Sequence, residues 1–229
     1  MRVHLLVIGQ SNVASHGRTR GASDFGQVFH DGTFQSLSDP IAGGTGDGGS
    51  VWTRLGPMLA ADGAVSEFVL TVSAQGGTSI ADWAPDGKCF GILAKRLPEI
   101  TTCARPITHV VFHQGERDTM MGTSCASYVH HFNQMKNCLD VSLHNCPWIV
   151  CQASYRMGLM SKEVKSAQNE IIKTSRNVIA GPDTDLLGAA YRYDNTHFND
   201  AGLTAFAAGL RDTFRCICRE AAGSSKSDA

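Results

Sequence analysis

The sequence has almost no net charge and no long apolar run, and these two absences exclude several classes of protein. Its 229 residues include 20 Lys and Arg against 21 Asp and Glu, which leaves a formal net charge of −1. Such a chain has no bulk electrostatic field to attract nucleic acid or an anionic membrane surface. No apolar stretch reaches the roughly 20 residues that a membrane-spanning helix needs. We therefore expect neither a nucleic-acid partner nor a membrane partner.

The cysteines lack the spacing of a metal or redox site. Eight are present, and Cys216-Ile217-Cys218 has the wrong spacing for a zinc or thioredoxin-type pair. Others, such as Cys138 and Cys151, lie among apolar residues, where a free thiol behaves as a small hydrophobe. We expect reduced thiols, no cofactor, no metal and a cytoplasmic protein. A signal peptide removed ahead of residue 1 would instead make the protein secreted, and the even cysteine count would then permit disulfides.

The composition is that of one globular unit. Hydrophobic residues make up 42% of the chain and charged residues 18%, which is ordinary for an enzyme and wrong for a disordered protein. An α/β domain of this length is usually a single unit, and no linker or internal repeat divides the sequence. We expect one catalytic domain over residues 1–222 and a disordered tail of small polar residues over 223–229. The sequence does not specify an oligomeric state.

Five apolar runs of strand length alternate with segments of helical spacing. The expected strands cover residues 3–8, 66–74, 108–112, 147–153 and 186–191. The expected helices cover residues 52–61, 88–100, 124–143, 161–177 and a last segment from Asn199 or Asp200 to about 222. This alternation predicts an α/β fold, a three-layer α/β/α sandwich with a five-stranded parallel sheet. Residues 19–50 are polar and glycine-rich, and we expect them to form a substrate-side loop that could contain a small hairpin.

The first strand ends abruptly in Gly9-Gln10-Ser11-Asn12. A glycine lets the chain turn sharply, and ligands of open α/β sheets bind outside the carboxyl ends of the strands. Ser11 is therefore expected at the mouth of a site. Taken alone, this serine could equally be a helix cap. As a nucleophile it would need a general base, an orienting acid and donors for an oxyanion.

The best base and orienting acid lie in the loop before the last helix. Asp194 and His197 are three residues apart, so both side chains can point the same way. The carboxylate can then accept a hydrogen bond from one ring nitrogen while the other nitrogen faces the serine. The loop follows the last expected strand, which places it at the same sheet edge as Ser11.

The oxyanion donors are expected from three strand ends. They are the backbone N–H of Ser11, that of Gly76 or Gly77, and the side-chain amide of Gln114. Glu116 is a poorer donor, because an ionised carboxylate only accepts hydrogen bonds. We expect Glu116 to bond neighbouring loops.

Together these blocks resemble the SGNH hydrolase superfamily. The matching segments are Gly9-Gln10-Ser11-Asn12, Gly76-Gly77-Thr78 with Trp83, His113-Gln114-Gly115-Glu116 with Asp118, and Asp194-x-x-His197. More narrowly, they resemble its sialate O-acetylesterase-like branch, which includes acetyl xylan esterases. The resemblance implies a metal-independent Ser-His-Asp mechanism that removes O-acetyl groups from sugars. The superfamily's usual third-block Asn is absent, with Gln114 in its place, and Val13 stands where the branch often has Met.

Several assignments remain open at this stage. Gln10, Asn12, Glu116 and Trp83 are candidates for substrate binding or for support of the catalytic residues. From the resemblance we expect the substrate to be a small or polymeric acetyl ester of sialic acid, of xylan or of a related sugar, and a general short-chain ester stays open. One rival is a flavodoxin-like module that binds a phosphate or nucleotide, although this first loop has no second early Gly and no Lys. Another rival is a non-catalytic sugar-binding protein on the hydrolase fold.

Overall fold

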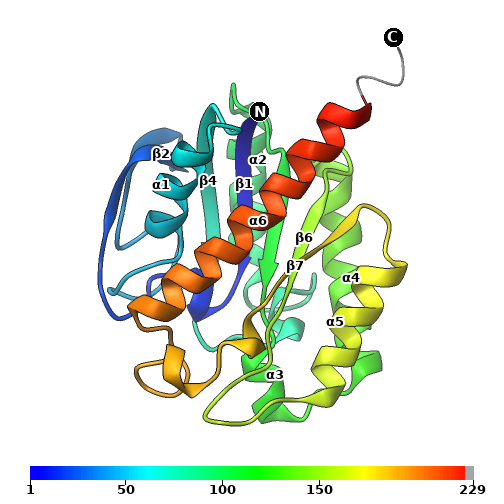
Figure 1. Cartoon of the computed structure of the whole chain (residues 1–229). Coiled ribbons are helices and arrows are strands. Elements are labelled where there is room, and N and C mark those ends of the chain that lie inside the picture. The colour runs from blue at the N-terminus through cyan, green and yellow to red at the C-terminus, as the bar shows by residue number, and fades with distance from the viewer. Residues whose placement is uncertain (225–229) are drawn as a thin grey trace.

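A seven-stranded sheet forms the centre of the computed structural model, which describes residues 1–224 (Figure 1). The spatial order is β3-β2-β4-β1-β5-β6-β7. Only β2 and β3 pair antiparallel, and all other neighbours are parallel. The strands are β1 (Arg2–Gly9), β2 (Ala22–His30), β3 (Thr33–Ser38), β4 (Glu67–Ala74), β5 (His109–His113), β6 (Trp148–Gln152) and β7 (Val178–Asp183).

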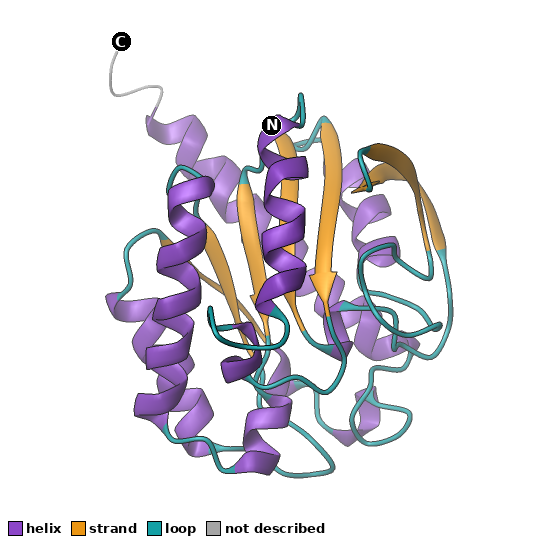
Figure 2. Cartoon of the chain, turned by 180° about the vertical axis from the view of Figure 1, so that it is seen from behind, coloured by secondary structure: helices purple, strands orange, loops and turns teal. Residues whose placement is uncertain are grey.

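Helices cover both faces of the sheet (Figures 1 and 2). One apolar cluster joins α1 and α6 to one face, and a second joins α2, α4 and α5 to the other. The α-helices are α1 (Trp52–Asp62), α2 (Phe90–Thr102), α3 (Glu116–Met121), α4 (Cys125–Ser142), α5 (Lys162–Thr174) and α6 (Asp200–Ser224). Four short 3₁₀ helices are η1 (Ser11–Val13), η2 (Ile80–Trp83), η3 (Thr184–Leu186) and η4 (Ala189–Tyr191). The predicted three-layer α/β/α architecture is confirmed.

Strand β1 shows why the sequence specifies this layering. Successive side chains of a strand point to opposite faces. Leu5 and Val7 accordingly enter the cluster under α1 and α6, while Leu6 and Ile8 enter the cluster under α2, α4 and α5. All four are completely buried. A strand buried on both faces needs apolar residues at every position, which is the continuous pattern that the sequence shows.

The prediction of five strands was wrong at both edges of the sheet. Residues 19–50 contain the β2–β3 hairpin, and β2 pairs with β4 only at two positions, Gln27 with Val69 and Val28 with Leu70. Most of β3 is exposed, so no buried apolar pattern marked it in the sequence. At the other edge, β7 occupies 178–183, whereas residues 186–191 form 3₁₀ turns and connecting chain. The sequence did not indicate this strand because it contains Gly181 and Pro182, and proline argues against a strand except at a sheet edge.

The five predicted helices are present, with ends shifted by a few residues, and α3 is an additional short helix. The predicted tail begins inside α6, which includes Gly223 and Ser224, and residues 225–229 lie outside the described residues. In the described part of the chain, no helix is long and apolar enough to cross a membrane. Over the same residues, no group of three or more His, Cys, Asp or Glu side chains could hold a metal ion.

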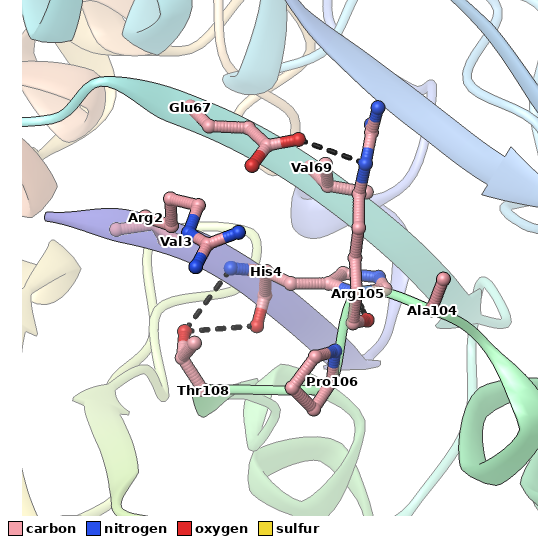
Figure 3. A pocket seen from close by; sticks show the side chains of 9 residues that line it. All are labelled: Arg2, Val3, His4, Glu67, Val69, Ala104, Arg105, Pro106 and Thr108. Atoms are coloured by element: carbon pink, nitrogen blue, oxygen red, sulfur yellow. Dashed lines mark hydrogen bonds and ion pairs between the residues drawn. The ribbon is translucent and has the colours of Figure 1, made fainter.

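A cavity of about 290 Å³ lies where β1 and β4 begin (Figure 3). Ser11 lies just beyond the opposite end of β1. His4 lines this cavity but is only 2% exposed. Its Nδ1 donates to the Arg105 carbonyl at 2.7 Å, and its Nε2 lies 2.9 Å from the Thr71 hydroxyl. Burial lowers the pKa of His4 from 6.5 to about 4. The neutral ring is therefore part of the folded structure at neutral pH.

This buried histidine predicts a pH-dependent stability. Between pH 6.5 and about 4 the unfolded chain binds a proton at His4 that the folded chain does not, so stability falls as the pH falls through this window. His4→Asn should flatten the slope of unfolding free energy against pH by up to about 1.4 kcal/mol per pH unit there. The measurement is urea denaturation at several pH values. His130→Asn, at an exposed position of α4, should leave the slope unchanged, and equal slopes in both variants would contradict the assignment.

Candidate active site

Three strand ends are level with one another where the predicted motifs begin. Gly9 at the end of β1 pairs in register with Ala74 of β4 and with His113 of β5. A Cβ atom added at Gly9 would lie 2.1 Å from the His113 carbonyl oxygen, so only glycine permits this close approach. The chain then turns into η1, which begins at Ser11. The segments that follow Gly9, Ala74 and His113 therefore emerge at one sheet edge.

Ser11 is 4% exposed and lies at the start of η1. Its hydroxyl and its backbone N–H have no hydrogen-bond partner among the described residues. Both groups are therefore available to a ligand.

Asp194 organises the loop that carries His197. Its Oδ1 accepts hydrogen bonds from the backbone N–H groups of Thr196 at 2.9 Å and His197 at 2.6 Å. Its Oδ2 accepts from the His197 ring at Nδ1, at 2.6 Å. Because a carboxylate can only accept, Nδ1 carries a proton, and in the neutral form of the ring the lone pair is then on Nε2. Asn195 supports the tight turn with φ of 61°, a conformation that asparagine tolerates.

The pKa of Asp194 is lowered despite partial burial. Burial acts to raise the pKa, but the backbone and ring hydrogen bonds from His197, its charge and the Thr196 N–H together outweigh that effect. Asp194 is therefore ionised at neutral pH. An ionised Asp194 orients the imidazole and stabilises its protonated form.

The Ser11 turn and the residues that follow it contact the His197 loop at four places. The Tyr193 hydroxyl donates to the His16 carbonyl at 3.2 Å. The Asn12 amide donates to the Thr196 carbonyl at 3.3 Å. The Arg18 N–H donates to the Phe198 carbonyl at 3.0 Å. The rings of His16 and His197 stack with centroids 5.2 Å apart and planes inclined by 22°. The structure therefore brings together the predicted nucleophile segment and the predicted base segment, 184 residues apart at the Asn12–Thr196 contact.

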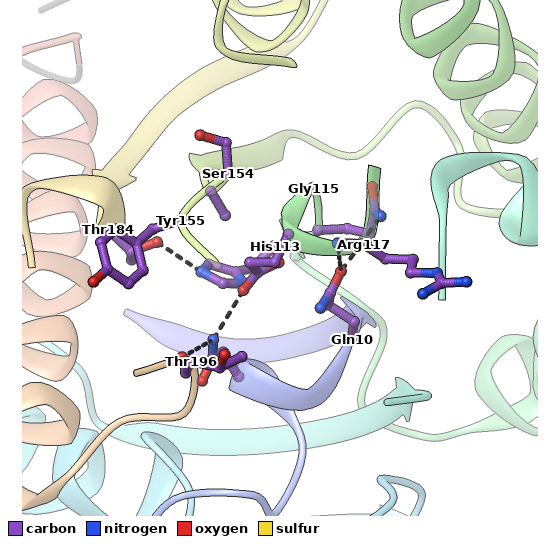
Figure 4. Close-up of polar contacts among 12 residues, drawn as sticks. Gln10, His113, Gly115, Arg117, Ser154, Tyr155, Thr184 and Thr196 are labelled. Carbon is purple, nitrogen blue, oxygen red and sulfur yellow. Dashed lines mark hydrogen bonds and ion pairs between the residues drawn. The ribbon is translucent and has the colours of Figure 1, made fainter. Parts of the chain in front are cut away.

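Buried polar residues, among them Gln10, His113 and Thr184, lie next to the ends of β1 and β5 (Figure 4). Asn12 donates to the Glu116 carboxylate at 2.9 Å, and Glu116 is only 1% exposed. The side-chain oxygen of Gln10 accepts from the backbone N–H of Arg117 at 3.3 Å, at the start of α3. Gln10 and Asn12 are 0% and 4% exposed. These two candidates for substrate binding therefore lie within the protein and hold the turn in place.

Gln114 and Trp83 are both completely buried. The amide nitrogen of Gln114 donates to the Thr78 carbonyl at 3.0 Å and to the carboxylate of Asp118. Its two N–H bonds are thus engaged, and neither is left for an oxyanion. The indole N–H of Trp83 donates to the Thr78 hydroxyl at 3.0 Å. In this structure Gln114 and Trp83 both bond to Thr78 and have no solvent-exposed surface.

The two glycines before Thr78 differ in whether their backbone N–H groups are already hydrogen-bonded. The Gly76 N–H donates to the Thr45 hydroxyl at 2.8 Å. Gly77 has a left-handed backbone with φ of 72°, and its N–H has no partner among the described residues. His16 also bonds the Thr45 hydroxyl, at 3.1 Å. The sequence assigned no chemical role to Thr45 or His16. The only signal was the glycine-rich loop around Thr45, which was expected on the substrate side.

A family model described as "Carbohydrate esterase, sialic acid-specific acetylesterase" matches residues 53–215. The match includes the segments of Gly76, Gln114, Asp194 and His197 but not Ser11. No curated protein matches the chain by sequence.

Solved structures of similar fold cover nearly the whole chain. A protein of Arabidopsis thaliana has a TM-score of 0.71 at 16% identity, with 94% of this chain and 99% of that chain covered. NanS has a TM-score of 0.71 at 15% identity, with coverage of 96% and 98%. A carbohydrate esterase family 3 structure from Talaromyces cellulolyticus has a TM-score of 0.58 at 13% identity, with coverage of 95% and 99%. The predicted SGNH hydrolase resemblance is confirmed.

The close approach at Gly9 gives a stability prediction. Gly9→Ala forces the His113 carbonyl to move and should lower the free energy of unfolding by about 2–4 kcal/mol in urea denaturation. The control is Gly91→Ala in α2, where an added Cβ meets nothing within 4 Å. That change should raise stability by up to about 1 kcal/mol, because alanine favours the helix. Similar effects of the two substitutions would refute the steric argument.

Proposed function

Because the chain belongs to the carbohydrate esterase family of sialic acid-specific acetylesterases, we propose that it is a serine esterase that removes O-acetyl groups from sugars. One observation carries the proposal. His197 is held by Asp194 through Nδ1, which leaves Nε2 as the ring nitrogen without a partner among the described residues, on a loop that contacts the turn bearing the unpartnered Ser11 hydroxyl. A base, its orienting acid and an available nucleophile are the parts that acyl transfer through serine requires.

In the proposed reaction Ser11 Oγ attacks the acetyl carbonyl carbon while His197 Nε2 takes the hydroxyl proton. The carbonyl π electrons move to oxygen and give a tetrahedral oxyanion. On its collapse the bond to the sugar oxygen breaks, and His197 returns its proton to that oxygen. Water then attacks the acetyl-serine with the same base, which releases acetate and restores Ser11. Asp194 stays ionised throughout and stabilises the imidazolium.

The proposed oxyanion donors are two backbone N–H groups. Those of Ser11 and Gly77 have no partner among the described residues, whereas the Gly76 N–H is bonded to Thr45. Gln114 supports the site through its bond to the Thr78 carbonyl, next to Gly77. It could become a third donor only by releasing Thr78 or Asp118. Each oxyanion donor is typically worth about 3 kcal/mol in the transition state.

The proposed substrate class is an acetylated carbohydrate. Two arginines could bind a negatively charged sugar. A sialic acid carries a carboxylate, which a guanidinium binds well. Arg117 and Arg18 are exposed, and neither side chain has a hydrogen-bond or ion-pair partner among the described residues. Arg117 starts α3 beside Gln10, and Arg18 adjoins the His197 loop. Arg54 instead bonds the Thr19 carbonyl at 2.9 Å and is less available.

Replacing the nucleophile is the first test. Ser11→Ala should lower acetate release from an activated acetyl ester by on the order of 10⁴-fold or more, with the fold intact. Acetate release from a panel of acetylated sialic acids, xylan and neutral sugars should depend on Ser11 for every sugar that the wild type accepts. Ser36→Ala, at an exposed position of β3, is the matched control and should be unaffected. A serine-directed phosphonate should label Ser11, and an unlabelled protein without esterase activity would favour the non-catalytic sugar-binding alternative.

Asp194→Asn tests the orienting acid separately from folding. The asparagine oxygen can still accept from the Thr196 and His197 N–H groups, but its NH₂ group forces the wrong ring tautomer of His197. We expect kcat to fall about 10³–10⁴-fold with a small change in melting temperature. Asp24→Asn serves as control, because Asp24 is exposed and its side chain has no hydrogen-bond or ion-pair partner among the described residues. Full activity in Asp194→Asn would show that His197 works without an orienting carboxylate.

A further inference from the structure

Arg192 is a buried cation that has no role in the reaction described above. Its side chain is almost entirely inside the protein, with 6% of the residue exposed. All of its hydrogen bonds go to backbone carbonyls. Nε donates to Leu187 at 3.1 Å, one terminal nitrogen donates to Thr184 at 3.1 Å, and the other makes a short bond to Thr196. The planar guanidinium thus joins three separate points of the chain between η3 and α6.

Two aromatic rings complete the surroundings of this guanidinium. Its central carbon lies 4.5 Å from the centre of the Tyr155 ring and 4.4 Å from that of Phe198. Burial lowers the pKa of Arg192, while the negative charges of Glu116 and Asp185 oppose that shift. Among the described residues, no carboxylate lies within ion-pair distance of it. A buried charge without a direct ion pair is costly, so its position calls for a specific reason.

The Thr196 carbonyl supplies that reason. It accepts from Arg192 on one side and from the Asn12 amide, at 3.3 Å, on the other. Thr196 immediately precedes His197, and Asn12 immediately follows Ser11. Asn12 is itself fixed by the buried carboxylate of Glu116. This one backbone oxygen therefore connects the loop that carries His197 to the turn that carries Ser11. Through Asn12 and Glu116 it is also linked to the start of α3.

We infer that Arg192 is a positioning residue. It fixes the Thr196 carbonyl, and thereby the neighbouring His197 ring, in position relative to the Ser11 turn. The inference rests on the proposed function, in which His197 is the base. Lysine cannot replace the guanidinium here, because one ammonium group cannot reach three carbonyls in a fixed planar geometry. Displacement of the catalytic base by about 1 Å is sufficient to reduce turnover about 10²-fold.

The test uses Arg192→Lys and Arg192→Met in the full chain. For both variants we expect kcat to fall about 10²-fold while KM changes less than about twofold, since no substrate contact is removed. A second readout does not depend on activity. Amide hydrogen exchange at Tyr193, Thr196 and His197 should accelerate, because these N–H groups are bonded within the loop. Amides of the central strands β1 and β5 should retain their protection. Arg176→Met, an exposed arginine, is the matched control for both readouts.

The outcomes separate this inference from the proposed function. If Ser11→Ala retains activity, the esterase mechanism fails, but faster exchange confined to the loop would still support the positioning role. If the esterase mechanism holds and Arg192→Lys keeps wild-type kcat and loop protection, the inference is overturned. It is also overturned if both variants lose protection equally in the loop and in β1 and β5, or fail to fold. Arg192 would then stabilise the whole domain rather than the His197 loop.

Discussion

The carbonyl oxygen of Thr196 is the point on which the candidate site depends. It receives the Asn12 amide from the first strand end and the Arg192 guanidinium from the last connection. Without these two bonds, the segments bearing Ser11 and His197 would be joined mainly by the stacked His16 ring, by the bond from the Tyr193 hydroxyl to the His16 carbonyl and by one backbone bond from Arg18. The sheet places the two segments at the same edge, but a parallel sheet alone does not set their separation to within a hydrogen bond.

The interior next to Ser11 is more polar than stability alone would favour. Several buried side-chain atoms there have no hydrogen-bond partner, among them Gln10 Nε2, Asn12 Oδ1, Gln114 Oε1 and Glu116 Oε2. Each such atom costs free energy relative to an apolar replacement. The large apolar clusters on both faces of the sheet offset that cost. Buried polar atoms without partners are typical of functional sites, where residues are placed for their chemistry even though this lowers the stability of the fold.

How far the sequence predicts this site depends on the range of the interactions involved. Asp194 and His197 could be paired from sequence because the contact spans three residues. The hydrogen bonds of the Gln114 amide could not be predicted from sequence. They go to Asp118, four residues later, and to Thr78, which follows a different strand. Trp83 shows the same limit, because a tryptophan in a loop-like segment gives no sign of being completely buried. Likewise, the central strands were predicted from apolar runs, whereas the edge strand β7 was concealed by Gly181 and Pro182.

The conspicuous sequence motifs therefore divide into two physical classes. Gln10, Asn12, Gln114 and Glu116 are nearly or fully buried and hold the strand ends together. The groups of these motifs left without a partner among the described residues are the Ser11 hydroxyl and N–H, the Gly77 N–H and Nε2 of His197. Residues that can distinguish one sugar from another must then come from the surrounding loops, where Arg18 and Arg117 are exposed. In the proposed function the motif residues and their supports set the acyl-transfer geometry, while substrate choice depends on positions that no short motif marks.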